Sequence, residues 1–220
     1  PNGCFEQTST SNYPNLLILD YLKESNQTKP EVESRARELL GRGYTKLTSF
    51  ECTNTAKNDK EGYEWFGGTA PAHEALTAYG LLQFRDMARV RDVDPAMLKR
   101  TQDYLMSRRD GKGGFQRNPL ALDSFGRAPD DVTNAYIVWA LTESGKDDDL
   151  TKELNALSEQ GKTSKDPYFL SLVANSLINR ARTDEGVKLL QTVAEAQKDD
   201  GHLDAEKTSI TGSGGRDLEI

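Results

Sequence analysis

Residues 130–145 have the sequence DDVTNAYIVWALTESG, and this stretch predicts one complete helix. Asp130 suits a capping position, because its carboxylate can accept a hydrogen bond from an unpaired backbone N–H of the first turn. Apolar side chains such as Val132 and Tyr136 follow at the spacing of one helix face. Gly145 then ends the helix, since glycine readily adopts the backbone conformation that follows a last helical turn.

The same pattern recurs along the chain and predicts an all-α fold with no convincing strand. The more apolar helices are expected near residues 13–24, 72–89, 131–144 and 167–180, and the more charged ones near 30–41, 95–108, 148–160 and 184–198. A helix that is apolar over much of its surface belongs inside, whereas one with a single apolar stripe belongs outside. The alternation therefore predicts about four inner–outer helix pairs of an alpha/alpha toroid.

Glycine and proline mark the expected boundaries of these helices. The second helix is predicted to stop at Gly41 and Gly43. The third is predicted to open at Pro71 with Thr69 as its cap, and Asp166-Pro167 has the capping acid and first-turn proline of another helix start.

Two charged helices are followed by similar Asp-Gly turns, at residues 110–115 and 200–203, and residues 61–66 resemble a looser copy. The tail from residue 209 to 220 predicts the lead-in to another inner helix. We therefore expect residues 1–220 to be a single domain fragment, truncated before its last helix pairs.

Composition excludes several classes of function. The net charge is −7 and no basic block occurs, so nucleic acid is a poor candidate partner. The sequence contains no run of about 18 apolar residues, which is the length that would predict a membrane span. The two histidines, His73 and His202, are too far apart in sequence to suggest a zinc site, and no cofactor is expected. Cys4 and Cys52 are too few for a disulfide framework, and Cys52 is predicted to be a small buried core residue.

Chemistry is concentrated in the first seven residues, Pro1-Asn2-Gly3-Cys4-Phe5-Glu6-Gln7. Side chains three apart lie on the same face of a helical turn, so the sulfur of Cys4 can reach the side-chain carbonyl carbon of Gln7. Displacement of ammonia would close an internal thioester ring of about 15 members, small enough for one turn to hold. The alternative is a chance spacing with an inert core cysteine.

The order of several motifs resembles the alpha-2-macroglobulin and complement family. Gly-Cys-x-Glu-Gln at residues 3–7 is similar to its thioester motif, with Phe5 at a site that is often Gly in the vertebrate members. Behind it, residues 76–79 (LTAY), 114–116 (GFQ) and 131–136 (DVTNAY) resemble later family segments in the same order.

The resemblance implies the thioester domain of a bacterial alpha-2-macroglobulin-like protein, a toroid of about six helix pairs. Such a protein is a single-use covalent trap of the endopeptidase-inhibitor type, used in defence, rather than an enzyme. Its implied partners are attacking proteases or surface nucleophiles, together with neighbouring domains that shield the thioester. Its implied location is extracytoplasmic, meaning periplasmic, cell-surface or secreted.

Target choice in this family depends on a residue that follows the Gly-Phe turn. Members that prefer hydroxyl targets carry a histidine there, and the family's register places Asp123 at that position in this chain. An acid cannot form the acyl intermediate that imidazole forms, so the resemblance predicts capture of amines such as lysine side chains. The alternative is that Asp123 is a solvated loop acid. Candidates to line a dry pocket around the thioester are Phe5, Tyr13, Trp65, Phe66 and Phe115.

His73 opens an inner helix and is a weaker candidate for the thioester chemistry, with a structural role as its alternative.

Two other classes of function are retained as alternatives. A toroid enzyme of glycan or isoprenoid metabolism would need cavity carboxylates, for which Asp123, Asp131 and Glu74 are the candidates. A cysteine hydrolase would use Cys4 and His73, but no oxyanion-hole motif is evident and the glutamine would have no required role.

Overall fold

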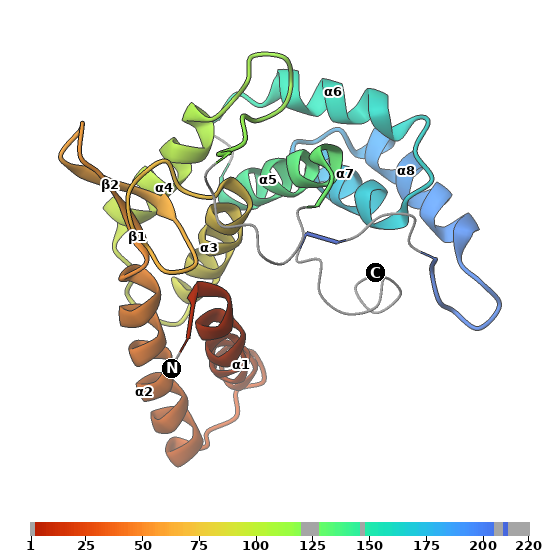
Figure 1. The fold of residues 1–220 in the computed structure, drawn as a ribbon. Helices are drawn as coiled ribbons and strands as arrows, with labels where there is room; N and C mark the ends of the chain where they lie inside the picture. The colour runs from red at the N-terminus through yellow and green to blue at the C-terminus, as the bar shows by residue number, and fades with distance from the viewer. Residues whose placement is uncertain (1–2, 120–127, 146–147, 205–208, 211–220) are drawn as a thin grey trace. The chain divides into compact units, whose positions relative to one another are not determined.

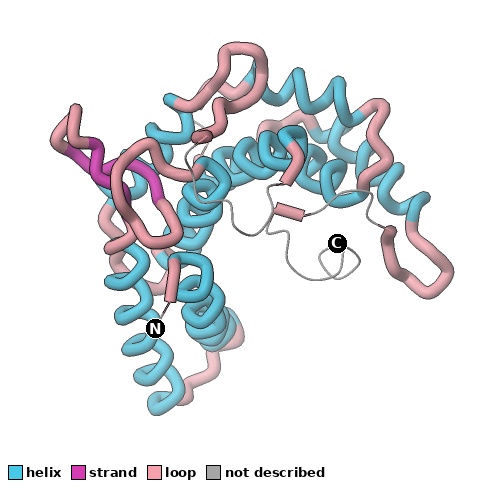
Figure 2. The backbone as a smooth tube through the Cα atoms, viewed as in Figure 1, coloured by secondary structure: helices cyan, strands magenta, loops and turns pink. Residues whose placement is uncertain are grey.

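The structure is a computed structural model, and it describes residues 3–119, 128–145, 148–204 and 209–210. The described residues form eight helices and one two-stranded antiparallel hairpin (Figures 1 and 2). The helices are α1 (Phe5–Glu24), α2 (Pro30–Thr48), α3 (Glu74–Met87), α4 (Pro95–Ser107), α5 (Asp130–Ser144), α6 (Thr151–Gly161), α7 (Pro167–Asn179) and α8 (Thr183–Ala196), and the strands are β1 (Glu51–Asn54) and β2 (Asp59–Tyr63). The predicted all-α class is confirmed, with the hairpin as an addition.

The chain divides into two compact units. The first unit extends to Ser107, includes Asn118, and contains α1–α4 and the hairpin. Within it, α1 packs along α2 (Figure 1), and α3 contacts α4 and β2. The second begins at Arg108 and holds α5–α8, with α7 packed against α5, α6 and α8. That residues 1–220 form one truncated domain stays a prediction.

The predicted alternation between apolar and charged helices is confirmed by burial. Helix α5 buries side chains around most of its circumference, as does α7, whereas α8 buries only Gly186 and Leu189. The sequence therefore separates helices enclosed by their neighbours from helices that cover them on one side.

Helix α1 begins eight residues earlier than the apolar pattern indicates, at Phe5 rather than near residue 13. Its first turns bury polar side chains, namely Thr8, Ser9 and Asn12, and Ser9 donates a 2.7 Å hydrogen bond to Gln83 Oε1 of α3. Because no apolar stripe marks these turns, periodicity alone could not place them in a helix.

The predicted stop at Gly41 and Gly43 is wrong, since α2 continues through both to Thr48. Gly43 lies against α1, where a Cβ would come within 2.1 Å of the Asn12 side chain. The glycine therefore provides a close approach between two helices rather than a helix end.

The segment between α2 and α3 contains the only strands among the described residues, and none was expected. Residues 61–66 do not end a helix but complete β2 and the turn after it. The start of α3 also differs from the prediction, because His73 rather than Thr69 is the capping residue and Pro71 precedes the helix. Short strands with polar outward positions carry too little periodicity to be recognised.

Other predicted helix starts are confirmed. Asp166 Oδ1 accepts a 2.8 Å hydrogen bond from the Phe169 N–H at the start of α7. Helix α5 begins at Asp130 and is followed by Gly145 as expected, although Pro129 is the capping residue. In the turn after α4, Asp110 Oδ1 accepts hydrogen bonds from the backbone of Lys112 and Gly114, which holds the predicted Asp-Gly turn closed.

No helix within the described ranges is both long and apolar enough to cross a membrane. The same part of the chain holds no cluster of three or more His, Cys, Asp and Glu side chains placed to bind a metal ion.

Candidate functional site

Cys4 and Gln7 meet at the first turn of α1. Cys4 is the capping residue, with extended backbone angles (φ −77°, ψ −179°), and Gln7 is the third residue of the helix. The Gln7 side chain folds back over the start of the helix, where its Oε1 accepts a 3.3 Å hydrogen bond from the Cys4 N–H. This is one half of a capping box, and it brings the carboxamide of Gln7 beside the residue that carries the sulfur.

Gly3 makes room for this arrangement. Its φ of +101° lies in a region that favours glycine, and a Cβ there would come within 2.2 Å of Gln7 Oε1. The folded-back glutamine therefore occupies the space that any side chain at residue 3 would need.

The two reactive groups differ in their access to solvent. Cys4 is 5% exposed, whereas Gln7 is exposed. The residue that carries the sulfur is therefore largely shielded from solvent, and the residue that carries the carboxamide is not.

Phe5 anchors the motif in the core of the first unit. Its ring is fully buried and lies edge-on or tilted against Phe50, Tyr63 and Phe84, with centroid distances of 6.2, 5.1 and 6.4 Å. Its backbone N–H donates a 2.8 Å hydrogen bond to the carbonyl of Trp65. The residue between Cys4 and Glu6 is therefore fixed both by packing and by a backbone hydrogen bond.

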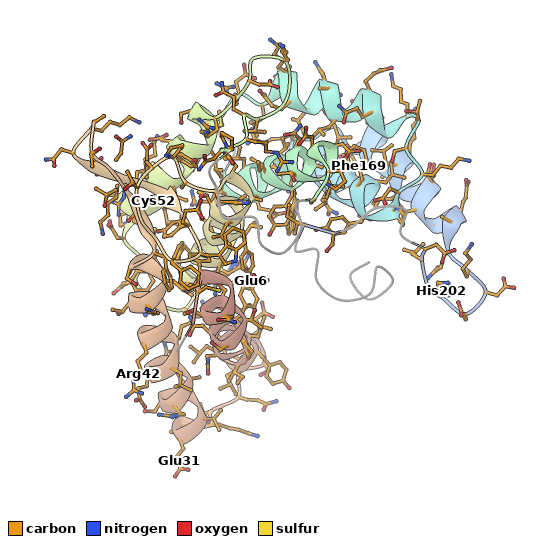
Figure 3. The ribbon with its side chains drawn as sticks, viewed as in Figure 1. Glu6, Glu31, Arg42, Cys52, Phe169 and His202 are labelled. Atoms are coloured by element: carbon orange, nitrogen blue, oxygen red, sulfur yellow. The ribbon has the colours of Figure 1, made fainter. Side chains whose placement is uncertain are left out.

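Trp65 makes a second contact with the motif. Its indole Nε1–H donates to Glu6 Oε2 at 3.2 Å, and Glu6 lies on α1, as labelled in Figure 3. The other neighbour of Trp65 is His73, with ring centroids 4.8 Å apart and planes at 84°. The turn after β2 is thus placed directly against residues 5 and 6.

His73 is buried and has a defined structural role. Its Nδ1 accepts a 3.2 Å hydrogen bond from the Leu76 N–H, which caps α3. In the neutral imidazole this acceptor role assigns the proton to Nε2. The imidazole is thus held in one orientation beside the tryptophan that touches the motif.

The remaining candidates are distributed over several places. Asp123 lies outside the described residues. Glu74 is buried in the first unit and accepts a 3.2 Å hydrogen bond from the Asn118 N–H. Asp131 lies in the first turn of α5 in the second unit, where it accepts from the Val132 N–H.

Of the five aromatic residues predicted to line a dry pocket, Phe5 lies within the motif and Trp65 contacts it. Tyr13 instead donates a 2.5 Å hydrogen bond to Asp86, and burial together with that carboxylate raises the pKa of its hydroxyl. Phe66 is 69% exposed, and Phe115 is buried in the second unit.

Cys52 is fully buried in β1, as expected for a core residue. Burial, followed by the negative charges of Glu64 and Glu51, raises the pKa of its thiol from 9.0 to about 12. The thiolate is therefore strongly disfavoured there, and the Cys52 thiol is unreactive.

The sequence predicts Trp65 only as an aromatic that lines the pocket, and it gives no signal for the hydrogen bonds between Trp65 and residues 5 and 6. Trp65 and Glu6 are 59 residues apart in sequence, and the element that joins them is the unexpected hairpin.

The fold and the site together define a class of protein: a helix-pair domain whose first helix opens with a facing cysteine and glutamine. A family model for the A-macroglobulin TED domain matches residues 1–209, and the chain belongs to this family. The resemblance found in the sequence is thereby confirmed.

Individual relatives agree with this assignment. Alpha-2-macroglobulin-like protein 1 of Mus musculus is 28% identical over 153 residues, covering 66% of this chain and 10% of its own length. Thioester-containing protein 1 (allele S1) of Anopheles gambiae is 26% identical over 198 residues, covering 83% of this chain and 14% of its own length. The chain thus spans only a small part of the curated relatives it matches.

A solved structure supports the fold. Alpha-2-macroglobulin of Escherichia coli, activated by porcine elastase, matches with a TM-score of 0.69 at 15% identity, over 99% of this chain and 18% of that one.

Proposed function

We propose that Cys4 and Gln7 form an internal thioester and that this chain is the covalent-capture domain of a protease-trapping protein. The observation that carries the proposal is the folded-back Gln7 side chain, held by the Cys4 N–H in a space that only glycine at residue 3 leaves open. The family assignment supports the same reading.

Thioester formation uses only these two side chains. The Cys4 sulfur attacks the Gln7 carboxamide carbon, the S–C bond forms and the C–N bond breaks. The nitrogen leaves as ammonia and takes up the thiol proton, so no oxidant or cofactor is needed. One turn of helix supplies the proximity that makes ring closure effective.

The start of α1 also favours this chemistry electrostatically. Attack on the carboxamide places negative charge on Oε1, which already accepts the Cys4 N–H at 3.3 Å. The positive end of the α1 dipole stabilises the same charge. The donor is in place before the reaction, so little reorganisation is required.

In capture the Gln7 acyl carbon is again the electrophile, and the Cys4 sulfur changes from nucleophile to leaving group. An amine attacks the acyl carbon of the exposed residue Gln7, the C–N bond forms, and the C–S bond breaks. The Cys4 sulfur leaves as a thiolate and accepts the proton that the amine loses. Because the amide is not turned over, the protein is consumed in one event and is not an enzyme.

Asp123 is proposed to influence target choice. In the position of the hydroxyl-directing histidine, its carboxylate can accept a proton from an amine or attract a lysine side chain, which favours amides over esters. His73 is a weaker candidate for a role in the thioester chemistry. Because its Nδ1 is used to cap α3, that role would be exerted through its ring contact with Trp65.

The proposed partners are proteases and, in the intact parent protein, neighbouring domains. The E. coli structural relative was activated by porcine elastase, which supports a protease as trigger and target. Exposure of Gln7 argues for a shield from the rest of the parent, because water would otherwise hydrolyse the thioester. An extracytoplasmic location, such as the periplasm, fits an encounter with foreign proteases.

Intact mass tests the proposal directly. The thioester lowers the mass of the parent protein by one ammonia, and methylamine restores a higher mass while one thiol becomes titratable. Replacement of Cys4 by Ala is the matched control, since it keeps Gln7 but removes the sulfur. A parent protein with the plain sequence mass, or with unchanged covalent capture in the Cys4→Ala variant, would contradict the proposal.

Target choice has its own test. In the Asp123→His variant we expect the ratio of ester to amide products to rise when glycerol and methylamine compete for the thioester. A ratio equal to that of the unaltered protein would remove Asp123 from the mechanism while leaving the thioester in place.

A further inference from the structure

We propose that Trp65 and Glu6 are positioning residues that hold the first turn of α1 in the geometry from which the thioester closes. The inference rests on the proposed function. It assigns roles to a side chain inside the motif and to a residue 59 positions away.

The contacts are placed between the two reacting residues. The Phe5 N–H donates to the Trp65 carbonyl at 2.8 Å, and the Trp65 indole N–H donates to Glu6 Oε2 at 3.2 Å. Residues 5 and 6 are the ones that separate Cys4 from Gln7. One tryptophan thus fastens both intervening residues, one through its backbone and the other through its side chain.

Trp65 can serve as a fixed reference because its own loop is tied down. The Thr53 N–H of β1 donates to the Gly68 carbonyl at 2.8 Å, and the Ala70 N–H donates to the Thr53 carbonyl at 3.0 Å. On its other side the indole contacts the buried His73 ring at 4.8 Å. The turn is therefore held by the hairpin and by the start of α3.

The chemistry requires such a device because helix ends fray. If the first turn opens, the Gln7 carboxamide leaves the Cys4 sulfur and the gain from proximity is lost. Phe5 packing restrains the turn from the core, and the bond to Glu6 restrains it from the outer side, where Glu6 is only partly buried. A carboxylate acceptor strengthens this bond and also suits the positive end of the helix.

The experiment uses the intact parent protein with three substitutions. Trp65→Phe keeps an aromatic ring but removes the indole N–H, and Glu6→Ala removes its acceptor. Glu6→Gln keeps an oxygen in the same place and is the conservative rescue. The readouts are the fraction of molecules that lack one ammonia by mass and the rate at which Cys4 is alkylated after methylamine treatment.

We expect Trp65→Phe and Glu6→Ala to lower the thioester fraction about fivefold, in line with the loss of a partly exposed charge-assisted hydrogen bond. Glu6→Gln should keep most of it. The double variant should be no worse than either single variant, because both remove the same bond. Phe66→Ala, at the 69% exposed next residue, is the matched control and should change nothing.

The alkylation rate separates this inference from the proposed function. Loosening of the turn should expose the 5% exposed Cys4 and raise its alkylation rate about fivefold in the two disrupting variants, whether or not the unaltered protein forms a thioester. Absence of the mass deficit in the unaltered protein would defeat the proposed function alone. Unchanged alkylation rates in Trp65→Phe and Glu6→Ala would overturn the positioning role, as would an unchanged thioester fraction in a protein that forms the bond.

Discussion

At Gly3 two separate constraints meet, one of backbone and one of space. The residue has φ +101°, and a Cβ would lie 2.2 Å from Gln7 Oε1. We expect Gly3→Ala to push the glutamine side chain away from Cys4 and to abolish most thioester formation, measured as the missing mass deficit. The stability of the protein should fall by only about 1–2 kcal/mol, because the site lies at the edge of the core.

Gly111→Ala provides the control for Gly3. Gly111 also has a positive φ, +74°, but a Cβ there would meet nothing within 4 Å, and the residue belongs to the second unit rather than to the thioester motif or the Trp65 loop. It carries the backbone strain without the clash. Equal loss of thioester in the two variants would show that strain, and not contact with Gln7, is the cause.

Cys52 gives the stability of the protein a component that depends on pH. Burial raises the pKa of its thiol from 9.0 to about 12, so the folded state favours the protonated form. The stabilisation that comes from the protonated thiol is fully present below pH 9 and is lost as the pH rises from 9 to 12, because the thiol of the unfolded state gives up its proton first.

We therefore expect the stability difference between the unaltered protein and Cys52→Ala to shrink by about 2 kcal/mol between pH 8 and pH 10.5. Guanidinium unfolding at the two pH values measures it. The tyrosines with raised pKa values are present in both proteins and cancel in the comparison. A constant difference would mean that the thiol has an ordinary pKa in the fold.

Among the elements, the hairpin connects the site to the start of α3. The Tyr63 N–H at the end of β2 donates a 2.9 Å hydrogen bond to Thr77 Oγ1, and that hydroxyl donates to the His73 carbonyl at 2.7 Å. Tyr63 and Thr77 are both fully buried. The Thr77 hydroxyl therefore connects the end of β2 to the start of α3 through two buried hydrogen bonds.

Replacement of Thr77 by Val should lower the free energy of unfolding by about 1–3 kcal/mol, because the Tyr63 N–H loses its acceptor without access to water. Thr77→Ser keeps the hydroxyl and should restore most of that loss. Chemical denaturation of the three proteins checks the order. Equal stability of the Val and Ser variants would show that the hydrogen bonds of the Thr77 hydroxyl do not stabilise the fold.

The elements that the sequence predicted well are those with strong periodicity and clear caps. Helix α7 begins where Asp166-Pro167 predicted, and α5 ends before Gly145. The apolar pattern did not extend to the first turns of α1, because Thr8, Ser9 and Asn12 are buried polar residues. The hairpin was not predicted because its strands have only four and five residues, too few to show a clear alternation of apolar and polar side chains.

The site was predictable where its residues are neighbours in sequence. Helical geometry showed that Cys4 and Gln7 can meet, and the resemblance to the family favoured a thioester over a chance spacing. The hydrogen bond between Trp65 and Glu6 could not, because it depends on how an unpredicted hairpin folds back across 59 residues. His73 was placed correctly at the start of a helix, but its capping bond to Leu76 appears only in three dimensions.

On the scale of the whole chain, the net charge of −7 would favour the approach of basic targets in the proposed capture reaction. Long-range attraction speeds the encounter with basic proteins and is screened by salt. We expect an increase from about 20 mM to about 500 mM NaCl to slow capture of a lysine-rich protein about threefold or more. The reaction with hydroxylamine, which is uncharged at neutral pH, should change little. Equal salt effects on both nucleophiles would exclude electrostatic steering.

The unequal exposure of Cys4 and Gln7 has a consequence for the proposed reaction after it has occurred. In that reaction the Gln7 acyl carbon joins an outside partner, while the Cys4 sulfur remains part of the protein as a thiol that does not cleave the new amide. The leaving group therefore cannot diffuse away, and a largely buried thiol is slow to be oxidised. Under the proposed function, a reacted molecule differs from an unreacted one by the attached partner and by one thiol at Cys4, and this thiol is a lasting chemical marker of the reaction.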